Sequence, residues 1–377
     1  MAIDLDAILE FAVKKSISDV HLQQGRAPAF RVNSNLASQK GAVPLTQEDV
    51  TGFLDKLITD DRKRKIFSET GSVDIGYNLR SIARFRFNIF RQYQGISLVG
   101  RVIPKRIPNF RDLNLPPVME KIAKERRGLI LVTGTTGSGK STTLASMLDY
   151  VNQTRPCHIL TIEDPVEFQF EGRMSMVNQR EIGDSADSFP SALRAALRQD
   201  PDTILIGELR DTETIETALQ AAETGHLVLS TMHTIDTVET IDRSVAVFPP
   251  HAQDQMRHLV AEVISWVISM RLLPRKDGSG RVPACEILHA TPRIREMIHE
   301  KAGRHAILEL VAKGHKVYGM QTFDQSLLRL HASETISLET AMENCSNPAD
   351  FKLRVSGIAG AEDADFQEFM KVDGTKR

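Results

Sequence analysis

Four short, largely apolar runs are spaced through the middle of the chain and alternate with stretches of helical periodicity. The runs extend over Leu129 to Thr133, His158 to Ile162, Thr203 to Ile206 and Leu227 to Thr231. Short apolar runs bounded by polar turns are typical of buried strands. The alternation predicts an α/β fold, in which a mostly parallel sheet has helices on both faces. Ligands bind at the carboxyl ends of the strands in such sheets.

The N-terminal part, residues 1–103, has the pattern of a small separate α/β domain. Helices are expected over Leu5 to Lys15 and over Gln47 to Ile58. Apolar and polar residues alternate strictly from Ala83 to Phe90, as in a half-buried strand. With the following apolar segment, Ile96 to Ile103, this strand is expected to form a hairpin.

Prolines crowd the next segment and predict an interdomain linker over residues 104–118. A second domain is expected over residues 119–356. Its last third, from about Gln253, has a helical pattern that includes one amphipathic helix over His251 to Leu272. The tail, residues 357–377, is polar, and we expect it to be poorly ordered.

A glycine-rich octapeptide from Gly134 to Ser141 follows the first apolar run and precedes a predicted helix over Thr142 to Tyr150. It matches G-x-x-x-x-G-K-[ST], the loop whose backbone N–H groups surround nucleotide phosphates. Lys140 is expected to reach the β- and γ-phosphates of ATP, and the Ser141 hydroxyl to ligate Mg²⁺. The residues expected to bind the nucleotide are Gly134, Thr135, Thr136, Gly137, Ser138, Gly139, Lys140, Ser141 and Thr142.

Acidic residues follow the second and third runs. The second run is followed by a cluster that begins at Glu163, and the third by Gly207 and Glu208. ATP hydrolysis needs one carboxylate near the Mg²⁺ ion and another that orients the attacking water. Gly207 stands where many ATPases have an aspartate, so we assign the metal to Glu163 together with Ser141. Glu208 is then the catalytic carboxylate.

Two histidines, His226 and His233, flank the fourth run. A lone histidine beside an apolar strand is more often structural than catalytic. Two around one strand of a nucleotide-binding sheet favour a role at the γ-phosphate for at least one of them. The sequence does not separate the two, so both are candidate catalytic residues.

The segment between Asp74 and Asp112 contains no acidic residue but many arginines and lysines. This pattern fits a solvated strand face or a nucleic-acid-binding patch. Phosphoryl transfer is also commonly completed by an arginine that comes from another domain or subunit. Arg86 and Arg101, on the two arms of the predicted hairpin, are the candidates for that role.

Composition excludes several other classes of protein. The 377 residues carry 47 basic and 49 acidic side chains, so the whole chain is no polyanion binder. No apolar run approaches the roughly 20 residues of a membrane helix, and the N-terminus lacks the layout of a secretion signal. We therefore expect a cytoplasmic protein without direct membrane insertion. The three cysteines are far apart, which argues against disulfides and structural zinc.

Together these motifs resemble the secretion ATPase superfamily of type II secretion and type IV pili, and are most similar to retraction ATPases of the PilT and PilU type. The resemblance runs from Ser18-Asp19-Val20-His21-Leu22 to Gly319-Met320-Gln321-Thr322-Phe323-Asp324. Between them lie the phosphate loop, the acidic box at Glu163, the motif ending at Glu208 and the histidine box.

The resemblance implies a PAS-like N-terminal domain joined to a RecA-like ATPase domain with a helical C-terminal part. It also implies a homohexameric Mg²⁺-ATPase that retracts type IV pili and so powers twitching motility. Its implied location is the inner-membrane base of the pilus machine, where its partners are a platform protein and a PilT-type paralogue. No nucleic acid is expected as a partner.

The position within the superfamily rests on smaller features. Secretion and extension ATPases are usually longer, with an extra N-terminal domain and a four-cysteine zinc insertion. This sequence shows neither feature, which favours a retraction ATPase. The segment Arg293 to Met297, written Ala-Ile-Arg-Asn-Leu in many relatives, departs from the family pattern and argues against an independent PilT-type motor. The wording of Met320 to Asp324 and the ending Asn347 to Arg354 are more similar to PilU-type accessory motors. The alternatives are a secretion or extension ATPase of the superfamily and, from another class, a nucleic-acid-stimulated motor.

Overall fold

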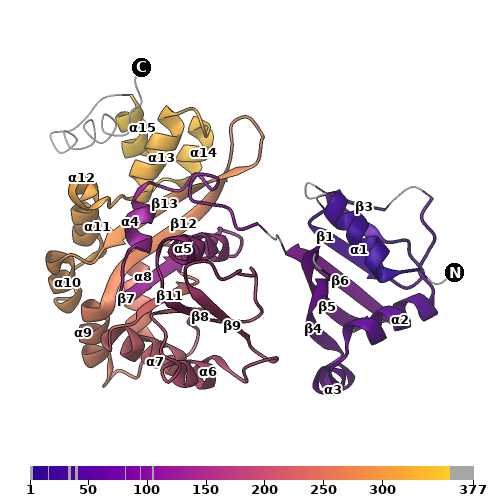
Figure 1. The fold of residues 1–377 in the computed structure, drawn as a ribbon. Coiled ribbons are helices and arrows are strands. Elements are labelled where there is room, and N and C mark those ends of the chain that lie inside the picture. Colours follow the sequence, from indigo (N-terminus) through magenta and orange to yellow (C-terminus); the bar gives the residue numbers. More distant parts are fainter. Residues whose placement is uncertain are drawn as a thin grey trace. The chain divides into compact units, whose positions relative to one another are not determined.

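The computed structural model describes residues 3–15, 17–32, 35–38, 41–80, 82–93, 95–103 and 106–356. The chain divides into two units, which are described separately (Figure 1). The N-terminal unit comprises Met1–Arg106 with Glu167–Gln169, and the C-terminal unit comprises Ile107–Val166 with Phe170–Arg377. The start of the predicted linker, residues 104–105, and the predicted tail, residues 357–377, lie outside the described residues.

The N-terminal unit is an antiparallel sheet with the strand order β3-β2-β1-β6-β5-β4. Its strands are β1 (Asp19–Gln23), β2 (Ala29–Val32), β3 (Asn35–Ser38), β4 (Ser72–Leu79), β5 (Ala83–Gln92) and β6 (Gly95–Ile103). Its helices are α1 (Leu5–Lys14), α2 (Gln47–Leu57) and α3 (Asp61–Thr70). The two predicted helices and the predicted hairpin are present. Helix α3 was not predicted, because its sequence is highly charged and only Phe67 is buried.

The core of this unit follows from the alternation in β5. Phe85, Phe87 and Ile89 are fully buried in one apolar cluster with Leu5 and Leu9 of α1. The residues between them on β5 are only partly buried, so this strand has one core face and one polar face. The polar face of β5 carries Arg84 and Arg86.

The C-terminal unit contains a seven-stranded sheet with the order β13-β12-β7-β11-β10-β8-β9. All neighbouring strands are parallel except the pair β12 and β13. The strands are β7 (Gly128–Thr133), β8 (His158–Glu163), β9 (Met176–Glu181), β10 (Thr203–Ile206), β11 (Leu227–Met232), β12 (Ile264–Pro274) and β13 (Arg281–His289). The four predicted strands are β7, β8, β10 and β11, and the predicted α/β class is confirmed.

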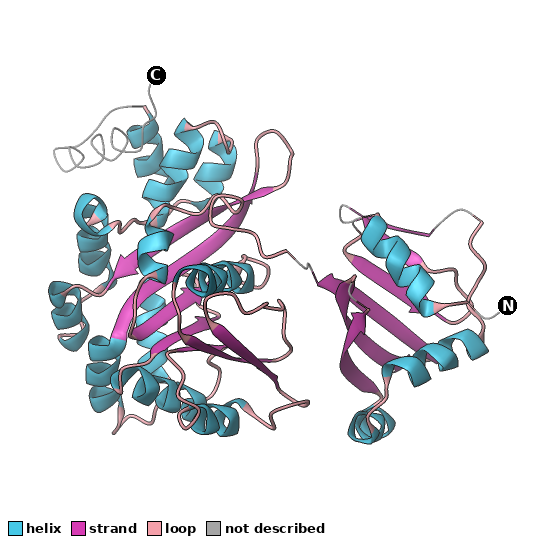
Figure 2. Cartoon of the chain, viewed as in Figure 1, coloured by secondary structure: helices cyan, strands magenta, loops and turns pink. Residues whose placement is uncertain are grey.

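Helices cover both faces of this sheet (Figure 2). The helices of this unit are α4 (Val118–Ala123), α5 (Lys140–Thr154), α6 (Phe189–Ala196), α7 (Thr212–Glu223), α8 (Thr237–Ala246), α9 (Gln253–Val263), α10 (Pro292–His299), α11 (Arg304–Lys313), α12 (His315–Tyr318), α13 (Phe323–Ala332), α14 (Leu338–Asn344) and α15 (Pro348–Val355). Alternate residues of β7 face two different cores: Leu129 and Leu131 join one, and Ile130 and Val132 join the other. None of the helices in the described residues is long and apolar enough to cross a membrane.

The helix predicted over His251 to Leu272 is wrong in its second half. Helix α9 ends at Val263, and strand β12 begins at Ile264. Trp266, Val267 and Ile268 are consecutive and fully buried, because β12 has side chains in the cores on both faces of the sheet. Apolar periodicity does not separate such a strand from a buried helix. After α9, the part predicted to be helical therefore contains a β12–β13 hairpin that extends the sheet.

The predicted linker is also too long. The segment Ile107–Val166 already belongs to the C-terminal unit. Phe110 and Leu115 are buried in its core, and the carbonyl of Pro108 accepts a hydrogen bond from Ser146 of α5. This proline-rich segment is thus packed against the C-terminal unit and is not a free interdomain linker.

Candidate nucleotide-binding site

The phosphate loop joins the end of β7 to the start of α5, as the motif predicts. Gly134, Gly137 and Gly139 have φ angles of 140°, 79° and 95°, a region that favours glycine. Helix α5 starts at Lys140, and its N-cap residue, Gly139, makes no side-chain capping bond. The N–H groups of the first turn therefore lack a side-chain acceptor, which is the arrangement that receives a phosphate.

Gly134 is required by the close approach of β12. A Cβ atom at this position would lie 2.4 Å from the backbone oxygen of Met270 and 2.6 Å from Ser138 Oγ. By contrast, a Cβ atom at Gly137 would meet nothing within 4 Å. The first glycine of the motif therefore lets the loop pack on β12, whereas Gly137 supplies only backbone freedom.

Lys140 is folded back over the loop. Its side chain is buried, and Nζ donates hydrogen bonds to the carbonyl oxygens of Gly134 at 2.8 Å and Thr135 at 3.0 Å. Among the described residues, Ser138 Oγ is a buried atom without a hydrogen-bond partner. An ammonium group, an unsatisfied hydroxyl and uncapped N–H groups around one loop form a site suited to a phosphate anion. Ser141 and Thr142 are half-buried in the first turn of α5.

Glu208 and His233 lie together at the carboxyl ends of β10 and β11, which are neighbours in the sheet. His233 Nε2 is 3.3 Å from Glu208 Oε2, and Arg210 forms an ion pair with the other carboxylate oxygen. The side chain of Glu208 is 18% exposed, so water reaches it. The sequence analysis identified both Glu208 and His233 but missed Arg210, although it lies only two residues after the catalytic candidate.

The environment of His233 keeps its imidazole neutral. Burial lowers the pKa of His233, and the positive charges of Lys140, Arg210 and Arg243 lower it further. Met232 pairs with Thr133, so His233 and Gly134 leave neighbouring strands side by side, which places His233 near the phosphate loop. A neutral imidazole can donate one hydrogen bond and accept another beside the carboxylate.

We expect ATP turnover to depend on this protonation state. Because the pKa of His233 is lowered, the neutral form persists to a lower pH than for an ordinary histidine of pKa 6.5. The His233-dependent loss of kcat should therefore have its midpoint below pH 6.5. A pH profile of kcat measures this midpoint. The acidic fall in kcat should vanish in His233→Asn and persist in the control His251→Asn, which changes an exposed histidine. An identical acidic fall in all three proteins would contradict the role of His233.

Glu163 ends β8, the strand beside β10. Its carboxylate is buried and accepts hydrogen bonds from Thr161 Oγ1 at 2.7 Å and Gln179 Nε2 at 3.2 Å. Gly207 N donates to the carbonyl of Ile162, so the backbone that leads to Glu208 runs directly beside Glu163. Two strands, β11 and β10, lie between β7 and β8. The strand ends are thus about 14 Å apart, at about 4.8 Å per strand.

His226 lies at the opposite end of β11 and corrects the sequence interpretation. Its Nδ1 is 2.9 Å from the carbonyl oxygen of Ala221 and 3.2 Å from Thr224 Oγ1, so the ring covers the end of α7. The six residues of β11 separate it from the carboxyl edge, a distance of about 20 Å at about 3.3 Å per residue. The structure therefore brings His233, and not His226, to the phosphate loop of its own chain.

Arg86 and Arg101 are cross-strand neighbours in the N-terminal unit, on β5 and β6. Arg101 Nε donates to Asp19 Oδ1 at 2.8 Å, and Arg86 Nε lies 3.8 Å from Asp74 Oδ1. The side chain of Arg101 is 70% exposed and that of Arg86 is 39% exposed, so both guanidinium groups remain accessible on one sheet face. Their catalytic role stays a prediction.

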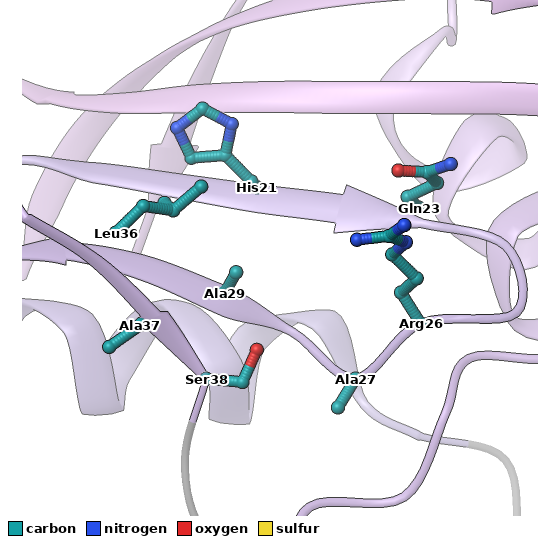
Figure 3. A pocket seen from close by; sticks show the side chains of 8 residues that line it. All are labelled: His21, Gln23, Arg26, Ala27, Ala29, Leu36, Ala37 and Ser38. Carbon is teal, nitrogen blue, oxygen red and sulfur yellow. The ribbon is translucent and has the colours of Figure 1, made fainter.

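A separate pocket of about 500 Å³ is also found in the N-terminal unit, against β1, β2 and β3 (Figure 3). Its polar lining comes from His21, Gln23, Arg26 and Ser38. His21 Nε2 is buried without a hydrogen-bond partner, and burial lowers the pKa of this imidazole. None of the lining residues belongs to the predicted nucleotide site.

Comparison with known proteins places this geometry in a family. The family model described as "Type II/IV secretion system protein" matches residues 1–335. The chain belongs to this family. It is 43% identical to the type IV pilus retraction ATPase PilT of Pseudomonas aeruginosa, over 92% of this chain and 100% of that protein. It is 34% identical to the type IV pilus ATPase PilU of the same organism, over 96% of this chain and 94% of that protein.

A solved structure agrees with the sequence relatives. The crystal structure of the pilus retraction motor PilT with bound ADP matches with a TM-score of 0.84 and 42% identity. The match covers 92% of this chain and 98% of that chain. The resemblance to PilT/PilU-type secretion ATPases and the RecA-like core are therefore confirmed.

Proposed function

We propose that this chain is an ATP-hydrolysing hexameric motor that retracts type IV pili. The observation that supports it most is the convergence of Lys140, Glu208 and His233 at one edge of the sheet, in a chain that is similar to PilT over most of its length. Binding of ADP by the related motor supports a nucleotide as the ligand of the phosphate loop. The reaction is ATP and water to ADP and phosphate.

Phosphate binding uses the loop and Lys140. The N–H groups at the start of α5 donate to the phosphate oxygens, and Lys140 exchanges its contacts with the Gly134 and Thr135 carbonyls for contacts with the β- and γ-phosphates. The site is preorganised, because the ammonium group is already held over the loop.

Hydrolysis uses Glu208 and His233. Glu208 accepts a hydrogen bond from the attacking water and orients its lone pair toward the γ-phosphorus. His233 is neutral and 3.3 Å away, so it can steady the carboxylate without abolishing its negative charge. Arg86 or Arg101 supplies positive charge to the transition state, as arginines do in related chemistry.

The oxygen donors of the site fit Mg²⁺, which prefers carboxylate, hydroxyl and water ligands. The ion would neutralise part of the charge of the phosphates. Ser141 would hold it directly. Glu163, at the end of β8, would act through bound water, because Mg²⁺ usually keeps several waters and the two strand ends are far apart.

We propose that the motor acts at the inner-membrane base of the pilus machine, where a platform protein is the expected partner. Similarity to both PilT and PilU supports retraction and leaves an accessory role beside a PilT-type paralogue as the finer alternative. The test is to delete the gene and record pilus dynamics and twitching, with and without that paralogue. Lost retraction in the single deletion indicates an independent motor. A defect that appears only when the paralogue is weakened indicates an accessory one, and unchanged dynamics in every background reject the proposal.

A further inference from the structure

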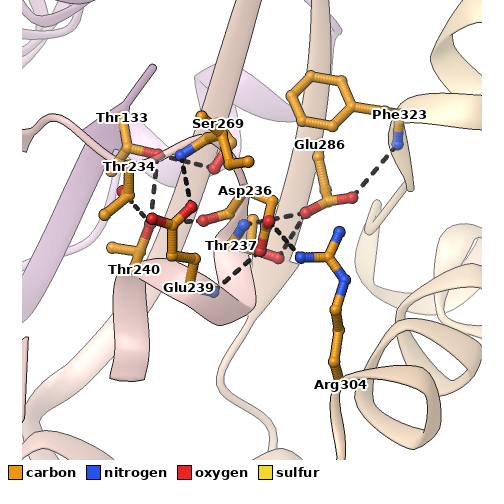
Figure 4. A network of polar contacts seen from close by, with 11 residues as sticks. Thr133, Thr234, Asp236, Thr237, Glu239, Thr240, Ser269, Glu286, Arg304 and Phe323 are labelled. Atoms are coloured by element: carbon orange, nitrogen blue, oxygen red, sulfur yellow. Dashed lines mark hydrogen bonds and ion pairs between the residues drawn. The ribbon is translucent and has the colours of Figure 1, made fainter. Parts of the chain in front are cut away.

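A buried polar network includes Thr234 and Asp236, which follow His233 in the chain (Figure 4). The loop of residues 233–236 joins β11 to α8 and is called the His233 loop below. Asp236 at its end and Glu286 on β13 are 1% and 3% exposed. Carboxylates are rarely buried to this extent without specific partners, because loss of water costs several kcal/mol per ion.

Asp236 has a different partner on each oxygen. Oδ1 accepts a hydrogen bond of 2.9 Å from the backbone N–H of Glu239 and so caps helix α8. Oδ2 forms an ion pair and hydrogen bond with Arg304, the first residue of α11. Arg304 thus lies 68 residues from Asp236 in sequence and supplies the positive charge that the buried carboxylate needs.

Glu286 makes a second connection from the same region. Its Oε1 accepts hydrogen bonds from Thr237 N at 2.9 Å and Thr237 Oγ1 at 2.8 Å. Its Oε2 accepts one from the backbone N–H of Phe323, the first residue of α13. The start of α8 is therefore tied to two helices of the C-terminal part, α11 through Arg304 and α13 through Glu286.

Threonines connect the other side of the His233 loop to the phosphate loop. Thr234 Oγ1 is 2.6 Å from Thr240 Oγ1, which in turn donates to Thr133 Oγ1 at 3.3 Å. Thr133 is the last residue of β7, directly before Gly134. The His233 loop is thus fixed at both ends: Thr234 is linked through Thr240 of α8 to the strand that leads into the phosphate loop, and Asp236 is linked to α11.

We propose that Arg304 is a positioning residue for ATP hydrolysis, which acts through Asp236 to hold the His233 loop so that His233 stays against Glu208. The inference rests on the proposed ATPase function. Without the guanidinium group, the buried charge of Asp236 draws in water or turns toward solvent, and the His233 loop shifts with it. The phosphate loop keeps its own contacts, so nucleotide binding is retained.

The test compares steady-state ATP turnover of the full-length wild type, Arg304→Met and the matched control Lys313→Met. Lys313 ends the same helix, is similarly exposed and forms an ion pair with Glu309. We expect Arg304→Met to lose about ten- to a hundredfold in kcat, since small displacements of catalytic groups have effects of this size. KM for ATP should change less than about twofold. Lys313→Met should match the wild type, and Arg304→Lys should recover part of the loss.

A second variant keeps the inference testable if Arg304→Met does not assemble. Asp236→Asn retains the oxygen that caps α8 but removes the charge that pairs with Arg304. It should lower kcat by a similar factor at unchanged KM, and the double variant should lose no more than either single one. Wild-type kcat in Asp236→Asn, or equal effects of Arg304→Met and Lys313→Met, overturns the inference. Absence of turnover in the wild type instead rejects the proposed function.

Discussion

Replacing Glu208 by glutamine should lower kcat for ATP by about 10²- to 10⁴-fold, the range found when a general base is removed. Binding of ATP should stay within about twofold, because glutamine has the same shape and Glu208 does not belong to the phosphate loop. Glutamine keeps a hydrogen-bond acceptor but lacks the charge that orients water. Phosphate release under multiple turnover and binding of a nonhydrolysable ATP analogue are the two measurements.

The matched control is Glu216→Gln, which removes an exposed carboxylate from α7 of the same unit. Its turnover should equal that of the wild type. Unchanged phosphate release from Glu208→Gln would refute the assignment of the catalytic carboxylate. Loss of binding as well as turnover would instead mean that Glu208 supports the loop, through Arg210 or His233, rather than the reaction itself.

Replacing Lys140 by alanine should weaken ATP binding at least about a hundredfold. Two charge-assisted hydrogen bonds to phosphate would be lost, each worth about 1.5 to 3 kcal/mol. Titration with a fluorescent ATP analogue measures the effect, and Lys124→Ala, at an exposed lysine that follows α4, is the control. If Lys140→Ala bound the analogue as tightly as the control, the phosphate loop would not be the nucleotide site. The two variants should therefore behave differently: Glu208→Gln retains the affinity for ATP and loses turnover, whereas Lys140→Ala loses affinity.

Much of the candidate site could be predicted, because its residues directly follow the strands that carry them in the sequence. The phosphate loop follows β7 and Glu208 follows β10, so strand order alone places both at the carboxyl edge. The same logic should have separated the two histidines. His226 precedes β11 and His233 follows it, so only His233 can reach that edge.

Contacts between residues far apart in the chain could not be predicted. The pairing of Asp236 with Arg304 depends on how α11 packs, and no local pattern encodes it. Strand β12 was taken for a helix because burial on both faces removes the alternation that marks a strand. The predicted length of the linker was wrong for a similar reason. Proline content indicates a stiff backbone but does not show whether a side chain such as Phe110 is buried in a core.

The contact between Gly134 and Met270 limits how the molecule can be divided. The floor beneath the phosphate loop is a strand encoded more than 130 residues downstream, as the hydrogen bond between Thr133 and Ser269 also shows. A fragment that stops after α9 would keep the whole glycine-rich motif but expose its underside to solvent. Minimal versions of this enzyme, and chimaeras that exchange its C-terminal half, must therefore carry the β12–β13 hairpin along with the motif.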